Sequence, residues 1–311
     1  MTVLLTIVAV ALALSIAALL VWEVLHRRSP LVRAWRPSTM PGRVTGGLGM
    51  LTDGHPHDRL RSDEPETVLL LHGLGGTSDY FGDLYEGLAG EHRLVMVDLL
   101  GFGRSLDDHR TDFSIDAHVA AIDGALESIG AGSDRVCVAA FSMGSAVALS
   151  WAARHAGRVT EVVLWGPPTY PGEMTDDEIV AESGPLTKLV WSERPTARRI
   201  CRWQGRHRWA AGWVMAAFAP RFPVSVSRWA SHHSWLGYRT SFEQLVLGAS
   251  WSELFADVDA PITVFRGTED PVGRRTTLAQ VAPRSTIVDV DDADHHIPIT
   301  HPQLLFEQLG S

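Results

Sequence analysis

The 311-residue sequence has little cysteine and no internal repeat or low-complexity tract. Its two cysteines, Cys137 and Cys201, are too few and too far apart for a disulfide framework or a cysteine-based metal site. We therefore expect inert thiols, a reducing compartment, and neither a metal ion nor another cofactor. The formal net charge of -9 disfavours nucleic acid as a partner.

Charged residues are also absent from residues 2–22, which are dominated by Leu, Ala, Val and Ile. With a rise of ~1.5 Å per residue, such a helix would cross a hydrocarbon core of about 30 Å, so residues 1–24 are predicted to form a transmembrane anchor. A cleaved signal peptide would need a basic segment ahead of a shorter apolar run. Arginines follow the apolar run, with no acid between Glu23 and Asp53, which predicts a single-pass protein with a cytoplasmic globular part.

Residues 25–52 are interpreted as a juxtamembrane linker that runs into an early hairpin. From Glu66 onward, short β-branched runs alternate with amphipathic segments, a pattern that predicts an α/β protein with a mostly parallel sheet flanked by helices. This core is assigned to residues 53–169 and 251–311. The predicted strands are 67–71, 94–97, 135–140, 159–165, 261–266 and 286–290, and the predicted helices are 79–89, 116–129, 144–155 and 301–309.

Residues 170–250 interrupt this alternation, because they contain helical patches but no convincing strand. We interpret them as an inserted helical cap, rich in tryptophan and arginine and poor in acids. Such a cap could line an apolar tunnel or lie against an anionic membrane leaflet, and it would then admit a lipid-like ester. Its tryptophans and arginines are Trp191, Trp203, Trp209, Trp213, Trp229, Trp235, Arg194, Arg198, Arg199, Arg202, Arg206, Arg208, Arg221, Arg228 and Arg239.

Ser142 lies in the segment Ala140-Phe141-Ser142-Met143-Gly144, between a predicted strand and a predicted helix. A serine at such a sharp turn is held out of the backbone, beside the amide groups that open the helix. Ser142 is therefore a candidate nucleophile, although a serine before a helix can also be a simple N-cap. A serine hydroxyl needs a base, an acid that orients the base, and an anion site.

Candidates for the acid and the base follow the last two predicted strands. Asp270 lies in the turn after strand 261–266, where Glu269 is the alternative acid. His295 follows strand 286–290, with His296 as its neighbour and alternative. The chain order serine, acid, histidine is the order of a nucleophile-elbow hydrolase, in which all three residues lie at the carboxyl ends of strands.

The segment Leu71-His72-Gly73-Leu74-Gly75-Gly76 follows the first predicted parallel strand. Its glycines let the backbone approach a bound carbonyl group, so the backbone amides of Leu74 and Met143 could together form an oxyanion hole. His72 could be a second base or a buried residue that supports this loop. Asp98, which begins the glycine-bearing turn Asp98-Leu99-Leu100-Gly101-Phe102-Gly103-Arg104-Ser105, is interpreted as a structural acid.

Together these motifs resemble the α/β-hydrolase superfamily, specifically its cap-bearing esterase, lipase and carbon-carbon hydrolase branch, over residues 66–311. The resemblance implies that Ser142 is the nucleophile, His295 the general base and then acid, and Asp270 its orienting partner. It also implies that Leu74 and Met143 supply oxyanion amides, with His72 and Gly73 in support. The chain departs from the family at Ala140, where glycine is usual. A serine at residue 142 disfavours dehalogenases and epoxide hydrolases.

Two other clusters could suggest metal binding. His232 and His233 lack further ligands at a suitable spacing and are interpreted as a polar cap surface. The acids Asp291, Asp292 and Asp294 lack the glycine and distal glutamate of a calcium loop. The function predicted from the sequence is a membrane-anchored serine hydrolase of apolar carboxylic esters. The alternatives are a carbon-carbon bond or thioester hydrolase with the same triad, and a non-catalytic binding protein.

Overall fold

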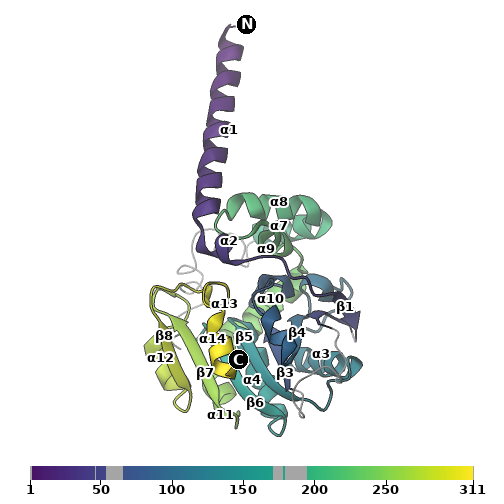
Figure 1. Ribbon diagram of the computed structural model, residues 1–311. Coiled ribbons are helices and arrows are strands. Elements are labelled where there is room, and N and C mark those ends of the chain that lie inside the picture. Colours follow the sequence, from purple (N-terminus) through teal and green to yellow (C-terminus); the bar gives the residue numbers. More distant parts are fainter. Residues whose placement is uncertain (1, 46, 54–65, 171–177, 179–194, 311) are drawn as a thin grey trace.

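A computed structural model describes residues 2–45, 47–53, 66–170, 178 and 195–310 of the chain. Its centre is an eight-stranded sheet in the order β1-β2-β4-β3-β5-β6-β7-β8 (Figure 1). The strands are β1 Gly42–Thr45, β2 Leu48–Thr52, β3 Glu66–Leu71, β4 Arg93–Asp98, β5 Arg135–Phe141, β6 Val159–Trp165, β7 Ile262–Gly267 and β8 Thr286–Val290. The hairpin β1-β2 and its pairing with β4 are antiparallel, and the other pairs are parallel.

The predicted mostly parallel sheet, its six predicted strands and the early hairpin are confirmed, with strand ends that differ by about one residue. The central strands are predictable from the sequence because they are continuous apolar runs. Parallel strands covered by helices on both faces are buried on both faces and carry such runs. Strand β5 shows this directly, since every residue from Val136 to Phe141 is buried.

Helices cover both faces of the sheet, and a separate apolar core fills each interface. One core contains side chains of α3 (Ile115–Ser128), α4 (Gly144–Arg154), α10 (Trp235–Ser241) and α11 (Trp251–Ala256). The other contains side chains of α2 (Pro30–Ala34), α13 (Ile297–Thr300) and α14 (Gln303–Leu309). Helix α12 (Arg275–Val281) connects β7 to β8.

The helix predicted over residues 79–89 is wrong. Two short 3₁₀ turns, Ser78–Tyr80 and Glu86–Gly90, take its place. Gly82 between them has φ +57°, and a Cβ there would lie 2.3 Å from the carbonyl oxygen of Arg36. The chain therefore turns sharply at Gly82 to let the segment before β1 pack against it, which a continuous helix could not do.

The described part of the predicted cap consists of α7 (Pro195–Arg206), α8 (Arg208–Phe218), α9 (Val224–Trp229), α10 and a π-helical segment, Phe242–Leu247. No strand occurs among the described residues of this region. Helices α7, α8 and α9 lie together at one end of the molecule, above the carboxyl ends of the parallel strands (Figure 1). Trp191 and Arg194, two residues of the predicted aromatic and basic set, lie outside the described residues.

Helix α1 (Thr2–Arg28) projects from the body beside this group of cap helices (Figure 1). Within the part of the chain whose side chains are described, no helix has both the length and the apolar character needed to cross a membrane. The described side chains of α1 begin at Ala11 and include the charged residues Glu23, Arg27 and Arg28. The predicted single-pass anchor over residues 1–24, with a cytoplasmic catalytic domain, is therefore not supported.

Candidate active site

Ser142 occupies a strained corner between β5 and α4. Its φ is +52°, and its amide donates a hydrogen bond of 2.9 Å to the carbonyl oxygen of Trp165 at the end of β6. The Ser142 carbonyl in turn accepts a bond of 2.9 Å from the amide of Ser145 in the first turn of α4. A positive φ is costly for a residue with a Cβ and persists only where surrounding structure enforces it. This is the strand, turn and helix geometry of a nucleophile elbow.

Asp270 and His295 are brought together from the ends of β7 and β8. The Nδ1–H of His295 donates to Oδ2 of Asp270 at 2.8 Å, and Oδ1 of Asp270 accepts a bond of 2.8 Å from the amide of Val272. Asp270 is 5% exposed, whereas Glu269 is exposed. Of the two candidate acids, the structure therefore pairs Asp270 with a histidine and leaves Glu269 at the surface.

The two adjacent histidines have different surroundings. His295 pairs with Asp270, and its ring lies 4.8 Å from that of Phe141, the residue before Ser142. His296 instead shares a hydrogen bond of 3.1 Å with the hydroxyl of Tyr80 and packs edge-on against Phe222 of the cap. Burial and, secondarily, the charge of His295 lower the pKa of His296 to about 4, so His296 is neutral at pH 7. Of the two histidines, His295 is therefore the one that a carboxylate orients.

The loop after β3 lies directly against the nucleophile corner. An added Cβ on Gly73 would come 3.0 Å from the Cβ of Ser142, and one on Gly144 would come 2.6 Å from the carbonyl oxygen of His72. Because neither glycine has a side chain, the backbone of the loop after β3 can lie close to the backbone of the Ser142 corner. Leu74 follows Gly73 in this loop, and Met143 opens α4, so the two proposed amide donors flank Ser142.

His72 uses both ring nitrogens to brace this loop. Its Nδ1–H donates to the carbonyl oxygen of Gly73 at 2.7 Å, and its Nε2 accepts from the amide of Leu99 at 2.9 Å. Burial lowers the pKa of this fully buried histidine, and the nearby charge of Asp98 only partly offsets that effect. His72 is thus a neutral imidazole fixed between two loops, which is the geometry of a supporting residue.

Asp98 forms an ion pair with Arg104 that the sequence did not reveal. Oδ1 of Asp98 accepts from the amide of Ser78 at 2.6 Å, and Oδ2 accepts from the amide of Arg104 at 2.7 Å. The guanidinium of Arg104 lies 4.7 Å from the ring centre of Trp229 in α9. Asp98 therefore organises the loops after β3 and β4, as its interpretation as a structural acid requires, while Arg104 connects them to the cap.

The interpretation of His232 and His233 as a polar surface is wrong for His233, which is 7% exposed. Its backbone pairs with that of Phe102, and the carbonyl of His232 accepts a bond of 2.8 Å from the amide of Gly103. Both histidines thus fasten the cap to the loop after β4. Among the described residues, no group of three or more His, Cys, Asp or Glu side chains is arranged to hold a metal ion.

Gly166 was not identified from the sequence, although it closes the site beside the acid and base. Its φ is +52°, and an added Cβ would lie 2.8 Å from Oδ2 of Asp270 and 2.9 Å from Nδ1 of His295. Trp165, the preceding residue, holds the amide of Ser142. The end of β6 therefore positions all three candidate catalytic residues relative to one another.

Replacing Gly166 by alanine is expected to lower kcat by about 100-fold, since a misplacement near 1 Å costs about that much. The new methyl group would separate Asp270 from His295. Steady-state ester hydrolysis, with a thermal unfolding curve to correct for any loss of folded protein, measures the effect. Gly157→Ala is the matched control, because an added Cβ there meets nothing within 4 Å. Equal activity of the two variants would contradict the role assigned to Gly166.

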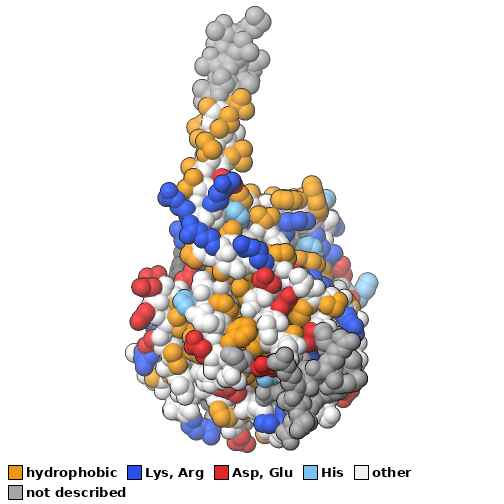
Figure 2. Space-filling model, viewed as in Figure 1, with side chains coloured by type: hydrophobic (Ala, Val, Ile, Leu, Met, Phe, Trp, Pro, Cys, Tyr) orange, Lys and Arg blue, Asp and Glu red, His pale blue; other side chains and the backbone are white. Residues whose placement is uncertain are grey.

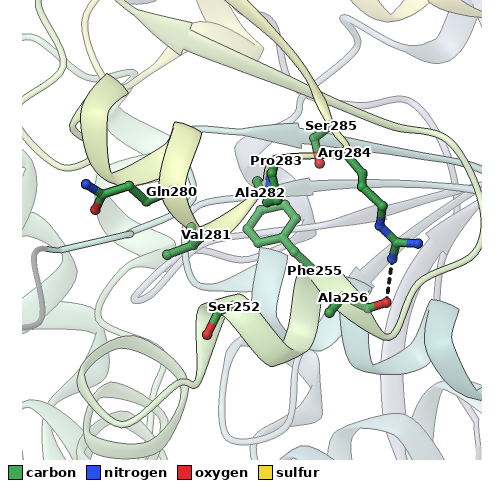
Figure 3. Close-up of a pocket in the computed structure, with 9 residues that line it drawn as sticks. All are labelled: Ser252, Phe255, Ala256, Gln280, Val281, Ala282, Pro283, Arg284 and Ser285. Atoms are coloured by element: carbon green, nitrogen blue, oxygen red, sulfur yellow. Dashed lines mark hydrogen bonds between the residues drawn. The ribbon is translucent and has the colours of Figure 1, made fainter.

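A surface cavity of about 190 Å³ lies between α11 and α12, away from Ser142 (Figure 3). Phe255 and Pro283 line it, and the guanidinium of Arg284 donates to the carbonyl oxygen of Ala256 at its edge. The segment 282–285 precedes β8, so the cavity lies at the amino ends of the strands. Asp270 and His295 follow the carboxyl ends, so this cavity is not part of the candidate active site.

This arrangement has the geometry of a nucleophile elbow, and comparison with known proteins agrees on the fold. The model of the α/β hydrolase fold family matches residues 66–302, so the chain belongs to the α/β-hydrolase family. It is 25% identical over 260 residues to "Probable lysophospholipase BODYGUARD 3" of Arabidopsis thaliana, covering 74% of this chain and 52% of that protein. The chain thus spans about half the length of that relative.

Two further matches are similar in part of the sequence or in fold. "Lipase 3" of Moraxella sp. (strain TA144) is 34% identical over 100 residues, which cover 32% of this chain and 30% of that protein. A solved structure described as "a membrane phospholipase A, a novel bacterial virulence factor" has a TM-score of 0.61 and 18% identity. That similarity covers 100% of this chain and 97% of the other, and at this identity it demonstrates the fold alone.

Proposed function

We propose that this protein hydrolyses carboxylic esters of apolar, lipid-like substrates through a Ser142-His295-Asp270 triad. The observation that carries the proposal is the 2.8 Å bond between His295 and buried Asp270, beside a serine at a positive-φ corner. A histidine oriented by a buried carboxylate, next to a partly exposed elbow serine, is the arrangement that activates a hydroxyl nucleophile. The names of two relatives, a probable lysophospholipase and a lipase, support an ester as the substrate.

In the first half of the reaction, Oγ of Ser142 attacks the ester carbonyl carbon while Nε2 of His295 accepts the hydroxyl proton. Asp270 holds the opposite ring nitrogen, Nδ1, which fixes the tautomer and stabilises the imidazolium that forms. The amides of Leu74 and Met143 stabilise the oxyanion of the tetrahedral intermediate. Collapse of this intermediate breaks the carbon-oxygen bond, and His295 protonates the departing alcohol.

In the second half, water hydrolyses the acyl-enzyme. His295 accepts a proton from the water molecule, whose oxygen attacks the acyl carbon. Collapse of the second intermediate then returns that proton to Oγ of Ser142 and releases the carboxylic acid. His296, neutral and partly buried against Tyr80, adds no positive charge beside His295. It therefore does not oppose formation of the imidazolium in either half.

The aromatic residues packed around the histidines of the site favour an apolar acyl group. The ring of Tyr80 stacks on Phe141 at 4.9 Å, and Phe222 of the cap packs on His296. A carbon-carbon bond or thioester hydrolase remains the second candidate, because arginines of the cap suit a substrate with a carboxylate or phosphate group. Both candidates use the same three residues, so only the scissile bond distinguishes them.

Side-by-side assay of p-nitrophenyl esters, acyl-coenzyme A thioesters and a vinylogous diketone tests the proposal. We expect the ester with a medium or long acyl chain to have a kcat/KM roughly tenfold or more above that of the others, because each buried methylene group adds to discrimination. If the thioester or the diketone has the higher kcat/KM, the proposed substrate is that class and not an ester. Absence of hydrolysis in every assay would favour a binding protein on this fold.

A further inference from the structure

Helix α8 has its large apolar side chains outside and its small ones inside. Trp209, Trp213, Val214 and Phe218, called here the cap face, are 73%, 46%, 44% and 71% exposed. The opposite half of the helix consists of small buried residues, Ala211, Gly212 and Ala216. An amphipathic helix on a protein surface normally buries its large apolar residues and exposes polar ones. The reversed pattern marks an interaction surface.

The small inward residues let α8 pack closely on α9. An added Cβ on Gly212 would lie only 3.2 Å from the backbone carbonyl oxygen of Arg228. The guanidinium of Arg228 lies 4.7 Å from the ring centre of Trp213, so it supports the cap face from its edge. The outward position of the aromatic rings is therefore fixed by tight helix packing behind them.

The sequence around the cap face is positively charged. No aspartate or glutamate occurs from Pro195 to Phe242, although Asp108 of the core pairs with Arg208 at 3.0 Å. Helix α7 carries four exposed arginines that have no acidic neighbour in the sequence. They are Arg198, Arg199, Arg202 and Arg206. Exposed tryptophan together with arginine is typical of a surface at the interface of an anionic bilayer.

Helix α1 is fastened to the same part of the cap. Nε1 of Trp22 donates to the carbonyl oxygen of Ala216 at 3.3 Å, and Nδ1 of His26 donates to that of Pro220 at 2.9 Å. The hydroxyl of Ser29 donates to the carbonyl oxygen of Arg221. All three acceptors lie in α8 or in the loop after it. Helix α1 and the cap face therefore keep a fixed relation to each other.

Helix α1 and the cap face on α8 both present apolar side chains at one end of the molecule (Figure 2). Hydrophobic atoms cover the described part of α1 and the outer side of α8, and basic side chains surround the base of α1 (Figure 2). The large apolar side chains of α1 that are at least 40% exposed are Leu12, Leu14, Ile16, Leu19, Leu20, Val21, Val24 and Leu25. These side chains and the cap face therefore lie at the same end of the molecule, with basic side chains between them.

We propose that the cap face and the described part of α1 dock together on the surface of an anionic lipid bilayer. The proposal requires no span across the bilayer, and it does not depend on the proposed ester hydrolysis. A second copy of the chain is the less suitable occupant, because a two-fold pairing of this surface would bring the same arginines against each other. An anionic lipid surface satisfies both the aromatic rings and the arginines.

A fluorescent probe whose emission depends on polarity tests the docking in the 311-residue chain. The environment-sensitive label NBD is attached at Phe218→Cys on the cap face, with Glu127→Cys on α3 as the matched control. Cys137 and Cys201 are buried, and burial raises the pKa of the Cys201 thiol to about 11, so the introduced thiol is the reactive one. The labelled proteins are mixed with phosphatidylcholine vesicles, with and without phosphatidylglycerol.

The label at residue 218 is expected to shift to the blue and brighten with phosphatidylglycerol vesicles, while the label at residue 127 stays unchanged. Arg198→Gln/Arg202→Gln should weaken binding to these vesicles by about 25-fold, at about fivefold per arginine. The control Arg154→Gln/Arg284→Gln removes two arginines near the amino ends of the strands and should leave vesicle binding unchanged.

Two results would overturn the docking proposal. If the protein sediments with vesicles while the label at residue 218 stays aqueous, α1 alone contacts the lipid. If that label shifts without vesicles as the protein concentration rises, the cap face is a contact between copies of the chain. Neither result bears on ester hydrolysis, which is measured separately on a soluble p-nitrophenyl ester, so failure of one proposal is distinguishable from failure of the other.

Discussion

Replacing Ser142 by alanine is expected to lower kcat for ester hydrolysis by about 10⁵-fold or more and to abolish labelling by a fluorophosphonate probe. Ser142 is the residue at the corner between β5 and α4 that is proposed to form the acyl-enzyme, and loss of the nucleophile in serine hydrolases removes nearly all catalysis beyond binding and the oxyanion hole. Steady-state kinetics and gel-based detection of the probe measure the two effects.

Ser150→Ala is the matched control for this experiment, because Ser150 is a buried serine of α4, the helix that follows Ser142, and lies about two turns away from the corner. It should retain both hydrolysis and labelling. Labelling of the Ser142→Ala protein at full strength would show that another serine reacts, and the triad assignment would then be wrong.

Replacing Asp270 by asparagine is expected to lower kcat by about 10³- to 10⁴-fold with a smaller change in KM. The asparagine keeps nearly the same shape but loses the charge that stabilises the imidazolium and fixes the His295 tautomer. Oδ1 can still accept from the amide of Val272, so the turn after β7 should stay folded. Thermal unfolding of the variant checks this directly.

The neighbouring substitution Glu269→Gln is the control for Asp270→Asn, since it removes an exposed carboxylate one residue away. We expect its kcat to stay within about twofold of the original protein, because a surface charge without a fixed partner contributes little. A large loss in Glu269→Gln together with near-normal activity in Asp270→Asn would transfer the role of the acid to Glu269.

The sheet and the candidate triad could be predicted from the sequence because their signals are local. Buried parallel strands such as β5 are continuous apolar runs, and Ser142, Asp270 and His295 each follow such a run directly. Parallel strands carry their carboxyl ends to one edge of the sheet. Residues distant in sequence are therefore expected to lie together, and the structure pairs Asp270 with His295.

The remaining features depend on contacts between distant segments, which no local pattern encodes. The turn at Gly82 exists because the segment around Trp35 packs there, so the periodicity of residues 79–89 predicts a helix that does not form. His233 is buried where the cap pairs with Phe102 and where its ring packs on Tyr238. Gly166 follows a predicted strand, but its importance comes from side chains contributed by β7 and β8.

The segment after α1 supports the aromatic residues beside Ser142. Leu31 and Trp35 are buried in the same core as Tyr80, and Nε1 of Trp35 donates to the Tyr80 carbonyl oxygen at 3.1 Å. Tyr80 in turn stacks on Phe141 beside Ser142. A shortened protein that starts at Pro37 would lose this support, so the smallest unit with an intact catalytic centre begins before Leu31.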